Sequence, residues 1–259
     1  MKVLALDFDG VISDSAPESF LVAVRTFSSF EPESWLTREA ATLEGLDLQA
    51  IKESPLYTSF VDLMPLGNRA EDFGVALKCL SEKREILDQK EWDVFRAAVD
   101  PNFIRDFHQH FYLERTALRE LDPKAWLALL NPFAPFINLL RKRQGDGLLC
   151  LATAKDRPSI QRLLEAYLIS DLFPEDRIFD KEAGVSKRFH LAALQQHLNV
   201  AYDQITFVDD KLNHLEDVAP LGVRGVLAGW GYNGPRERML AQQRGFTVCD
   251  LEQASTVLF

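Results

Sequence analysis

Cysteine is scarce in this chain, and long runs of apolar residues are missing. The 259 residues include three cysteines, Cys79, Cys150 and Cys249, which lie far apart in apolar surroundings. This spacing argues against a disulfide framework and a zinc site, and it favours buried thiols in a reducing compartment. No segment reaches the ~18 uninterrupted apolar residues that a membrane-spanning helix needs. Because Asp7 and Asp9 directly follow the first apolar run, we expect no signal peptide and a cytoplasmic protein.

Glycine and proline are also few, and positive charge is in deficit. Thirteen glycines and twelve prolines are too few for a fibrous or disordered chain. The 29 Lys and Arg residues against 39 Asp and Glu residues leave a formal net charge of −10. Such a chain lacks the broad positive surface that grips nucleic acid or an anionic membrane, so we expect neither as a partner. The 47% hydrophobic content supplies a sizeable core.

Four short apolar runs have the length and composition of buried β-strands. They cover residues 2–6, 148–152, 205–208 and 223–228. Between the later runs lie two segments, 157–168 and 186–198, whose apolar residues recur at helical spacing. Strands that alternate with amphipathic helices predict an α/β fold with a parallel sheet and helices on both faces.

The long segment between the first two of these runs has a different pattern. It is rich in Leu, Phe, Trp, Glu and Arg, and Phe103, Phe107 and Phe111 are spaced as on one helical face. No strand pattern alternates within it. We therefore predict an α/β core formed by residues 1–15 and 132–259, with an inserted all-α domain over residues 16–131.

Polar, chemically active residues follow the predicted strands where each strand ends. The carboxyl ends of parallel strands meet at one sheet edge, where open α/β sheets bind ligands. Taken singly, each of these residues has an ordinary explanation as a turn residue, a helix cap or a surface charge. The set consists of Asp7 and Asp9 after the first strand, Thr153 after the second, Lys187 at a helix start, and Asp209 and Asp210 after the third.

Together, these residues indicate phosphoryl-transfer chemistry. Carboxylates that meet at one edge repel each other unless a cation lies among them. Oxygen ligands without a predicted His or Cys ligand suit a hard ion, and Mg²⁺ is the first choice. Thr153 and Lys187 offer a hydroxyl donor and a positive charge to an anion. A metal, an anion cradle and a carboxylate are the parts that phosphoryl transfer requires.

The same residues, in the same order, resemble the motifs of the haloacid dehalogenase superfamily. The resemblance is to its phosphoglycolate-phosphatase-like members, which carry a helical cap after the first strand. It rests on segments 6–14 (LDFDGVISD), 151–153 (LAT), Lys187, 207–213 (FVDDKLN) and 221–233 (LGVRGVLAGWGYN). It implies a Rossmann-like core, a cap over residues 16–131 that opens and closes, and Mg²⁺-dependent hydrolysis of a small phosphorylated metabolite.

The resemblance also implies a role for each motif residue. Asp7 would be the nucleophile that forms an aspartyl-phosphate. Asp9 would protonate the leaving group and then activate water, while its backbone carbonyl helps to hold Mg²⁺. Thr153 and Lys187 would hold the phosphoryl oxygens. The implied metal site consists of Asp7, Asp9, Asp209 and Asp210.

Some features depart from the family pattern or leave alternatives open. Asn213 stands where many relatives carry a further acidic residue, which leaves Asp210 as its replacement. We interpret His214 as an outer helix residue, and His108 and His110 as residues that bind no metal. A phosphomutase of the same fold and a catalytically inactive binding module remain alternative functions. The sequence identifies neither the metabolite nor the oligomeric state.

Overall fold

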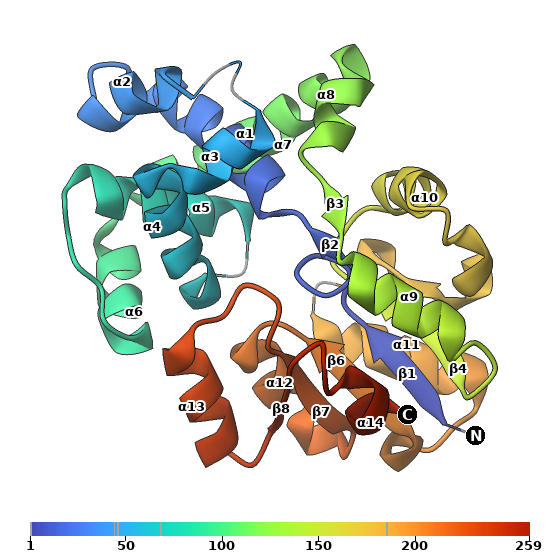
Figure 1. The fold of residues 1–259 in the computed structure, drawn as a ribbon. Coiled ribbons are helices and arrows are strands. Elements are labelled where there is room, and N and C mark those ends of the chain that lie inside the picture. Colours follow the sequence, from blue (N-terminus) through green and yellow to red (C-terminus); the bar gives the residue numbers. More distant parts are fainter. Residues whose placement is uncertain (1, 44, 46, 68, 185) are drawn as a thin grey trace. The chain divides into compact units, whose positions relative to one another are not determined.

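The computed structural model describes residues 2–43, 45, 47–67, 69–184 and 186–259. Contacts within the chain divide it into two compact units, one formed by Met1–Asp14 with Asn131–Phe259 and the other by Ser15–Leu130. The first unit holds the large sheet and the second is helical (Figure 1). That the second unit acts as a cap stays a prediction.

The first unit is built on a six-stranded sheet with the order β5-β4-β1-β6-β7-β8, in which all neighbours are parallel. The α/β fold class with a parallel sheet is thereby confirmed, and the four predicted strands form within one residue of their expected ends. The two outermost strands were not predicted, because they are only two and three residues long. The strands are β1 (Val3–Leu6), β4 (Leu148–Ala152), β5 (Ile178–Phe179), β6 (Ile205–Asp209), β7 (Arg224–Ala228) and β8 (Thr247–Cys249).

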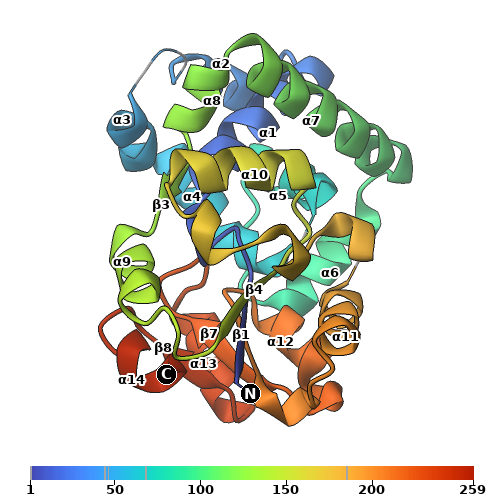
Figure 2. The same ribbon diagram turned by 90° about the vertical axis from the view of Figure 1, so that its right-hand side faces the viewer.

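Helices cover both faces of this sheet. Figures 1 and 2 place α9 and α14 on one face and α11 and α12 on the other. Helix α11 packs on β4 and β5, and α12 packs on β6 and β7. The helices of the unit are α9 (Ala134–Lys142), α10 (Arg157–Ala166), α11 (Lys187–Leu198), α12 (Leu212–Val218), α13 (Pro235–Gln243) and α14 (Ala254–Leu258).

Local signals set the ends of the two predicted helices. Helix α10 begins where the Asp156 carboxylate accepts a hydrogen bond from the backbone N–H of Ser159 (3.0 Å). It ends two residues early, because Leu168 adopts a left-handed backbone with φ of 57°. Helix α11 ends at Asn199, which is also left-handed. Asn tolerates this conformation better than most residues, so it stops the helix.

The strands are buried on both sides, as expected of a parallel sheet covered by helices. Every residue of β1 is buried. Val3 and Ala5 belong to the hydrophobic core that includes Leu191 of α11 and Leu215 of α12. Because side chains alternate along a strand, the next residue in this series, Asp7, continues on the α11 face.

The second unit consists of helices, and its described residues contain no strand. Along α7, whose phenylalanines are spaced as on one helical face, Phe107 and Phe111 are fully buried, and Phe103 packs against Phe107 (ring centroids 5.6 Å). Among the described residues, no helix has both the length and the apolar character needed to cross a membrane. The helices are α1 (Ala16–Phe30), α2 (Trp35–Ala41), α3 (Leu48–Glu53), α4 (Pro55–Leu63), α5 (Ala70–Ser81), α6 (Gln89–Ala98), α7 (Pro101–Leu121) and α8 (Pro123–Ala128).

A buried ion pair joins α1 to α7 within the second unit. Arg115 donates to both carboxylate oxygens of Glu18 at 2.7 Å, and Trp126 Nε1 lies 3.3 Å from the same carboxylate. The Glu18 side chain is only 1% exposed. A buried carboxylate is costly unless it is paired with a cation. Because helix packing keeps the Glu18 carboxylate away from water, Arg115 supplies the charge that neutralises it.

Arg115→Met is expected to lower the free energy of unfolding by about 3–5 kcal/mol, because it leaves the Glu18 carboxylate buried without its cation. Urea unfolding followed by circular dichroism measures the loss. Arg105→Met on the same helix is the matched control, since Arg105 pairs with Asp106 at the exposed surface and should cost less than about 1 kcal/mol. Equal losses in the two variants would contradict the expectation.

Candidate active site

Strand register places two carboxylates side by side at the end of the sheet. Leu6 of β1 pairs with Val208 of β6, so Asp7 and Asp209 lie at the same level, one residue further along. The backbone N–H of Asp7 continues the ladder by donating to Val208 O (2.9 Å). Both carboxylates are buried, and both lie on the α11 face of the sheet by the alternation of side chains.

Lys187, the first residue of α11, lies between these carboxylates. Its Nζ donates to Asp7 Oδ1 (2.7 Å) and to Ala152 O (2.9 Å), and lies 3.3 Å from Asp209 Oδ2. The side chain is 4% exposed. Burial alone would lower the pKa of Lys187, but Asp7 and Asp209 outweigh it and raise that pKa, so the ammonium stays charged. The structure thus brings together three of the predicted residues.

The two carboxylates differ in their electrostatic surroundings. Burial raises the pKa of Asp7, and the charge of Asp209 adds to this effect, against the opposing influence of Lys187. Burial also acts on Asp209, but His214 and Lys187 outweigh it and hold the pKa of Asp209 below its usual range. Hydrogen bonds from His214 and from the backbone N–H of Lys211 (2.9 Å) strengthen this effect.

Asp210 lies in the turn after β6, in a tight enclosure. Its Oδ2 accepts a hydrogen bond from the backbone N–H of Tyr232 (2.9 Å). A Cβ on Gly10, which has φ of +79°, or on Gly231 would overlap the Asp210 side chain, so both positions require glycine. Burial raises the pKa of Asp210 well above its usual range, and the neighbouring Asp209 adds to the shift. Asp210 is therefore a buried carboxylate that would gain from a nearby cation.

Asp9 forms an ion pair that the sequence analysis missed. Lys155 Nζ lies 2.9 Å from Asp9 Oδ1. The Lys155 side chain is almost buried, whereas that of Asp9 is 37% exposed. Thr153, at the end of β4, is buried, and its hydroxyl oxygen accepts a hydrogen bond from the backbone N–H of Lys155 (3.3 Å). The segment after β4 thus contributes two polar side chains, of which the sequence singled out only Thr153.

His214 is the second residue whose place the sequence did not predict. We expected an outer helix residue, but its Nδ1 lies 3.1 and 3.0 Å from the two carboxylate oxygens of Asp209. The sequence carried a weak signal, since His214 is on the first turn of the helix that follows the acidic pair.

The cluster fits a divalent cation. Ligand atoms of Asp7, Asp209 and His214 lie within 4.8 Å of one another. The adjacent carboxylate of Asp210 is buried and has a raised pKa, as expected of an anionic site that lacks full compensation. Carboxylate oxygens are the ligands that hard ions such as Mg²⁺ prefer. The carboxylate oxygens of this acidic cluster are therefore of the kind that hold a divalent cation.

A loop after β7 contacts the backbone around the site. Trp230 Nε1 donates to Val11 O (3.0 Å), and the Trp230 ring packs against Phe136 (centroids 4.8 Å). Asn233 Nδ2 donates to the backbone carbonyl of Asp210 (3.0 Å). These contacts tie the loop to the turn after β1 and to the acidic pair, so they fix the backbone on which the carboxylates stand.

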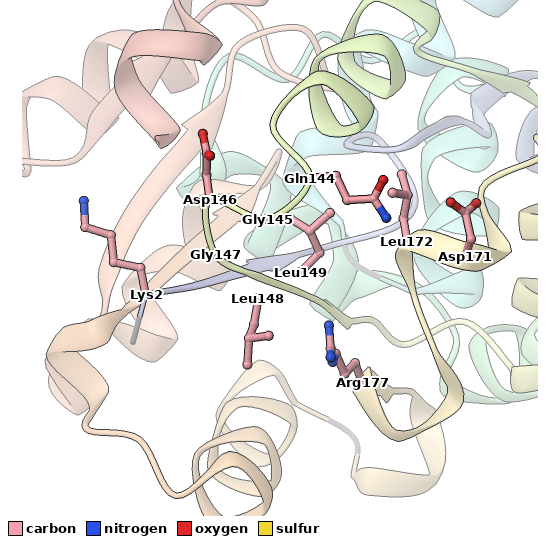
Figure 3. A pocket seen from close by; sticks show the side chains of 10 residues that line it. All are labelled: Lys2, Gln144, Gly145, Asp146, Gly147, Leu148, Leu149, Asp171, Leu172 and Arg177. Carbon is pink, nitrogen blue, oxygen red and sulfur yellow. The ribbon is translucent and has the colours of Figure 1, made fainter.

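A pocket of about 430 Å³ lies elsewhere in the first unit (Figure 3). Lys2, Leu148 and Arg177 are among its lining residues. Because Leu148 is the first residue of β4, this pocket is at the opposite end of the strand from Thr153. It is therefore separate from the cluster around Asp7.

Comparison with solved structures identifies the fold. A haloacid dehalogenase-like family hydrolase from Streptococcus pneumoniae is similar over 100% of this chain and 99% of its own, with 15% identity and a TM-score of 0.65. A predicted phosphoglycolate phosphatase from Haemophilus somnus is 16% identical over 100% of this chain and 98% of its own, with a TM-score of 0.63. A predicted phosphatase from Clostridium acetobutylicum is 13% identical over 99% of this chain and 97% of its own, with a TM-score of 0.56.

The chain therefore has the haloacid dehalogenase-like fold that the motif resemblance implied, with a Rossmann-like core. The sequence itself matches none of the protein-family models and none of the curated proteins with which it was compared.

Asp210→Asn is expected to stabilise the metal-free protein at neutral pH, because it removes a buried charge, and to weaken stabilisation by Mg²⁺. The folded-state pKa of Asp210 is raised, so protonation stabilises the fold. This stabilisation is complete below the unfolded pKa of about 3.9 and is lost as pH rises through the folded pKa. The Asn side chain can still accept the Tyr232 N–H without carrying a charge.

Denaturant unfolding over a pH series, with EDTA or with Mg²⁺, measures both effects. Asp203→Asn, at an exposed position, is the matched control and should change neither. A less stable Asp210→Asn protein, or one that Mg²⁺ stabilises as strongly as the wild type, would contradict the prediction.

Proposed function

We propose that this protein is a phosphatase that hydrolyses a small phosphorylated metabolite through an aspartyl-phosphate intermediate on Asp7, with Mg²⁺ as cofactor. One observation carries the proposal: the Lys187 ammonium holds the buried Asp7 carboxylate at the carboxyl end of β1, beside Asp209. The phosphatases among the similar folds support the same reaction class. The three free, buried cysteines agree with a cytoplasmic location.

The contacts of Asp7 suggest which oxygen attacks. Asp7 Oδ1 accepts hydrogen bonds from Lys187 Nζ (2.7 Å) and from the backbone N–H of Phe8 (2.7 Å). We assign attack on phosphorus to Oδ2, because its lone pairs are not committed to these two donors. The new Oδ2–P bond forms as the P–O bond to the leaving group breaks.

Asp9 is the proposed proton carrier. Its carboxyl group donates a proton to the leaving oxygen in the first step and removes one from water in the second, when the Oδ2–P bond breaks and phosphate leaves. Its partial exposure leaves room for a leaving group and for water. Lys155 pairs with Asp9 and would orient it before substrate binds. When the Lys155 ammonium turns to the phosphoryl group, Asp9 would lose this ion pair and could carry the proton.

The phosphoryl oxygens of a substrate need hydrogen-bond donors that do not already bind other groups of the protein. An ammonium has three N–H groups, and those of Lys187 face Asp7, Asp209 and Ala152 O. We therefore propose that Lys187 mainly positions Asp7. The Thr153 hydroxyl and the Lys155 ammonium are then the stronger candidates for the phosphoryl oxygens.

The proposed Mg²⁺ ligands are Asp7, the backbone carbonyl of Asp9, and the acidic pair Asp209–Asp210. Asp209 already accepts from Lys187, His214 and the Lys211 N–H, so Asp210 is the better-placed member of the pair for direct ligation. When bound, the metal would neutralise negative charge on the phosphoryl group and on the carboxylates around it.

Wild-type protein is expected to hydrolyse p-nitrophenyl phosphate only with Mg²⁺, and Asp7→Asn should lower the rate by about 1,000-fold or more, because the amide cannot form the covalent intermediate. Asp203→Asn is the control and should retain wild-type turnover. No turnover, together with no Mg²⁺-dependent binding of beryllofluoride, would favour the inactive binding module. Turnover that requires a bisphosphate activator would favour the phosphomutase.

Asp9→Asn is expected to accumulate a phosphoenzyme. p-Nitrophenolate leaves without a proton, so the first step can proceed, whereas hydrolysis of the intermediate lacks its base. Intact-protein mass spectrometry after acid quench should show the addition of one phosphoryl group. The double variant Asp7→Asn/Asp9→Asn should show none. A phosphoryl group that persists in the double variant would place the nucleophile elsewhere.

A further inference from the structure

Asp209 is held by three hydrogen-bond donors from three different parts of the first unit. Its Oδ1 accepts from the backbone N–H of Lys211 (2.9 Å), and its Oδ2 lies 3.3 Å from Lys187 Nζ. His214 Nδ1 reaches both oxygens, at 3.1 and 3.0 Å. The Asp209 side chain is 0% exposed, so bulk solvent does not reach its oxygens. Its orientation therefore depends on these contacts.

The fold brings His214 back onto Asp209 over a short distance in sequence. Asp209 ends β6, the chain turns at Asp210 and Lys211, and α12 begins at Leu212. His214 is thus on the first turn of α12 and faces the strand end that it follows by five residues. A carboxylate can only accept a hydrogen bond, so this geometry requires the proton on Nδ1 of His214.

We propose that His214 is a positioning residue: its Nδ1–H fixes the Asp209 carboxylate, which in turn holds Lys187 against Asp7. This inference rests on the proposed phosphatase function for its catalytic consequence. The order of contacts carries it, since His214 touches Asp209, Asp209 touches Lys187, and Lys187 touches Asp7. The outer partners of a site's ligands commonly set ligand orientation in this way.

The same cluster could also supply a nitrogen ligand to a metal, because His214 lies within 4.8 Å of the oxygens of Asp7 and Asp209. If Nδ1 were the ligand atom, the two roles would need opposite states of that atom. A positioning His214 carries a proton on Nδ1, whereas a ligand needs a bare lone pair there. The His214–Asp209 distances are those of hydrogen bonds, which favours the positioning role.

Nitrogen NMR of the metal-free protein tests the state of this atom without any assay of activity. The chain has five histidines, so comparison with His214→Asn assigns the His214 signals. At a pH where imidazoles are neutral, we expect His214 as the Nδ1–H tautomer. An Nε2–H tautomer with a bare Nδ1 would overturn the proposal, whether or not the protein is a phosphatase.

Kinetics of two substitutions test the catalytic consequence. His214→Leu removes the donor at similar size, and kcat is expected to fall on the order of 10-fold or more, with KM and the Mg²⁺ requirement little changed. In His214→Asn the amide N–H can replace Nδ1–H, so kcat should recover to within about 3-fold of the wild type. His197→Leu, a half-exposed histidine at the far end of α11, is the control for loss of an imidazole.

Three kinetic results would overturn the inference. The first is an equal loss in His214→Leu and His214→Asn, which indicates a packing role. The second is a loss that excess Mg²⁺ or Mn²⁺ restores, which indicates direct ligation. The third is no loss in either variant. If the wild type itself shows no turnover, the phosphatase proposal fails, and the NMR result alone decides the hydrogen bond.

Discussion

The structure of the site depends on one ammonium between two buried carboxylates. Asp7 and Asp209 end adjacent parallel strands at the same level, where their like charges would be costly without a cation. Lys187 supplies it because α11 begins on the face to which both side chains turn. Parallel pairing, side-chain alternation and the start of one helix therefore act together. A shift of one residue in any of them would separate the charges.

Much of this arrangement is predictable because it follows from local patterns. The four apolar runs and the polar residues after them are visible in the sequence, and the parallel sheet aligns their ends. The partners of Lys155 and His214 were not predictable in the same way. Lys155 meets Asp9 across 146 residues, and this pairing depends on β4 lying beside β1. Strand β5 was not predicted, because a strand of two residues forms no recognisable sequence pattern.

Glycines show a further limit of sequence reasoning. Gly10 was predictable as a turn residue, and its positive φ agrees. Its second requirement, room for the Asp210 side chain, depends on a contact across 200 positions in sequence, and Gly231 must also leave room for that side chain. The loop that contains Gly231 therefore contributes to the site by leaving space and by donating one backbone N–H at Tyr232. Neither contribution is visible in residue type alone.

The acidic pair shows how one strand end can produce two different carboxylates. Asp209 is the last strand residue, so it turns toward Lys187 and His214, and their charge and hydrogen bonds hold its pKa low. Asp210 is the first turn residue, so it meets glycine backbone and the Tyr232 N–H, and burial raises its pKa against the opposing charge of Lys211. The Lys187 ammonium already compensates the charge of Asp209. Asp210 therefore gains most from a bound metal ion. Metal affinity and the positioning of the nucleophile can thus depend on two different, adjacent residues.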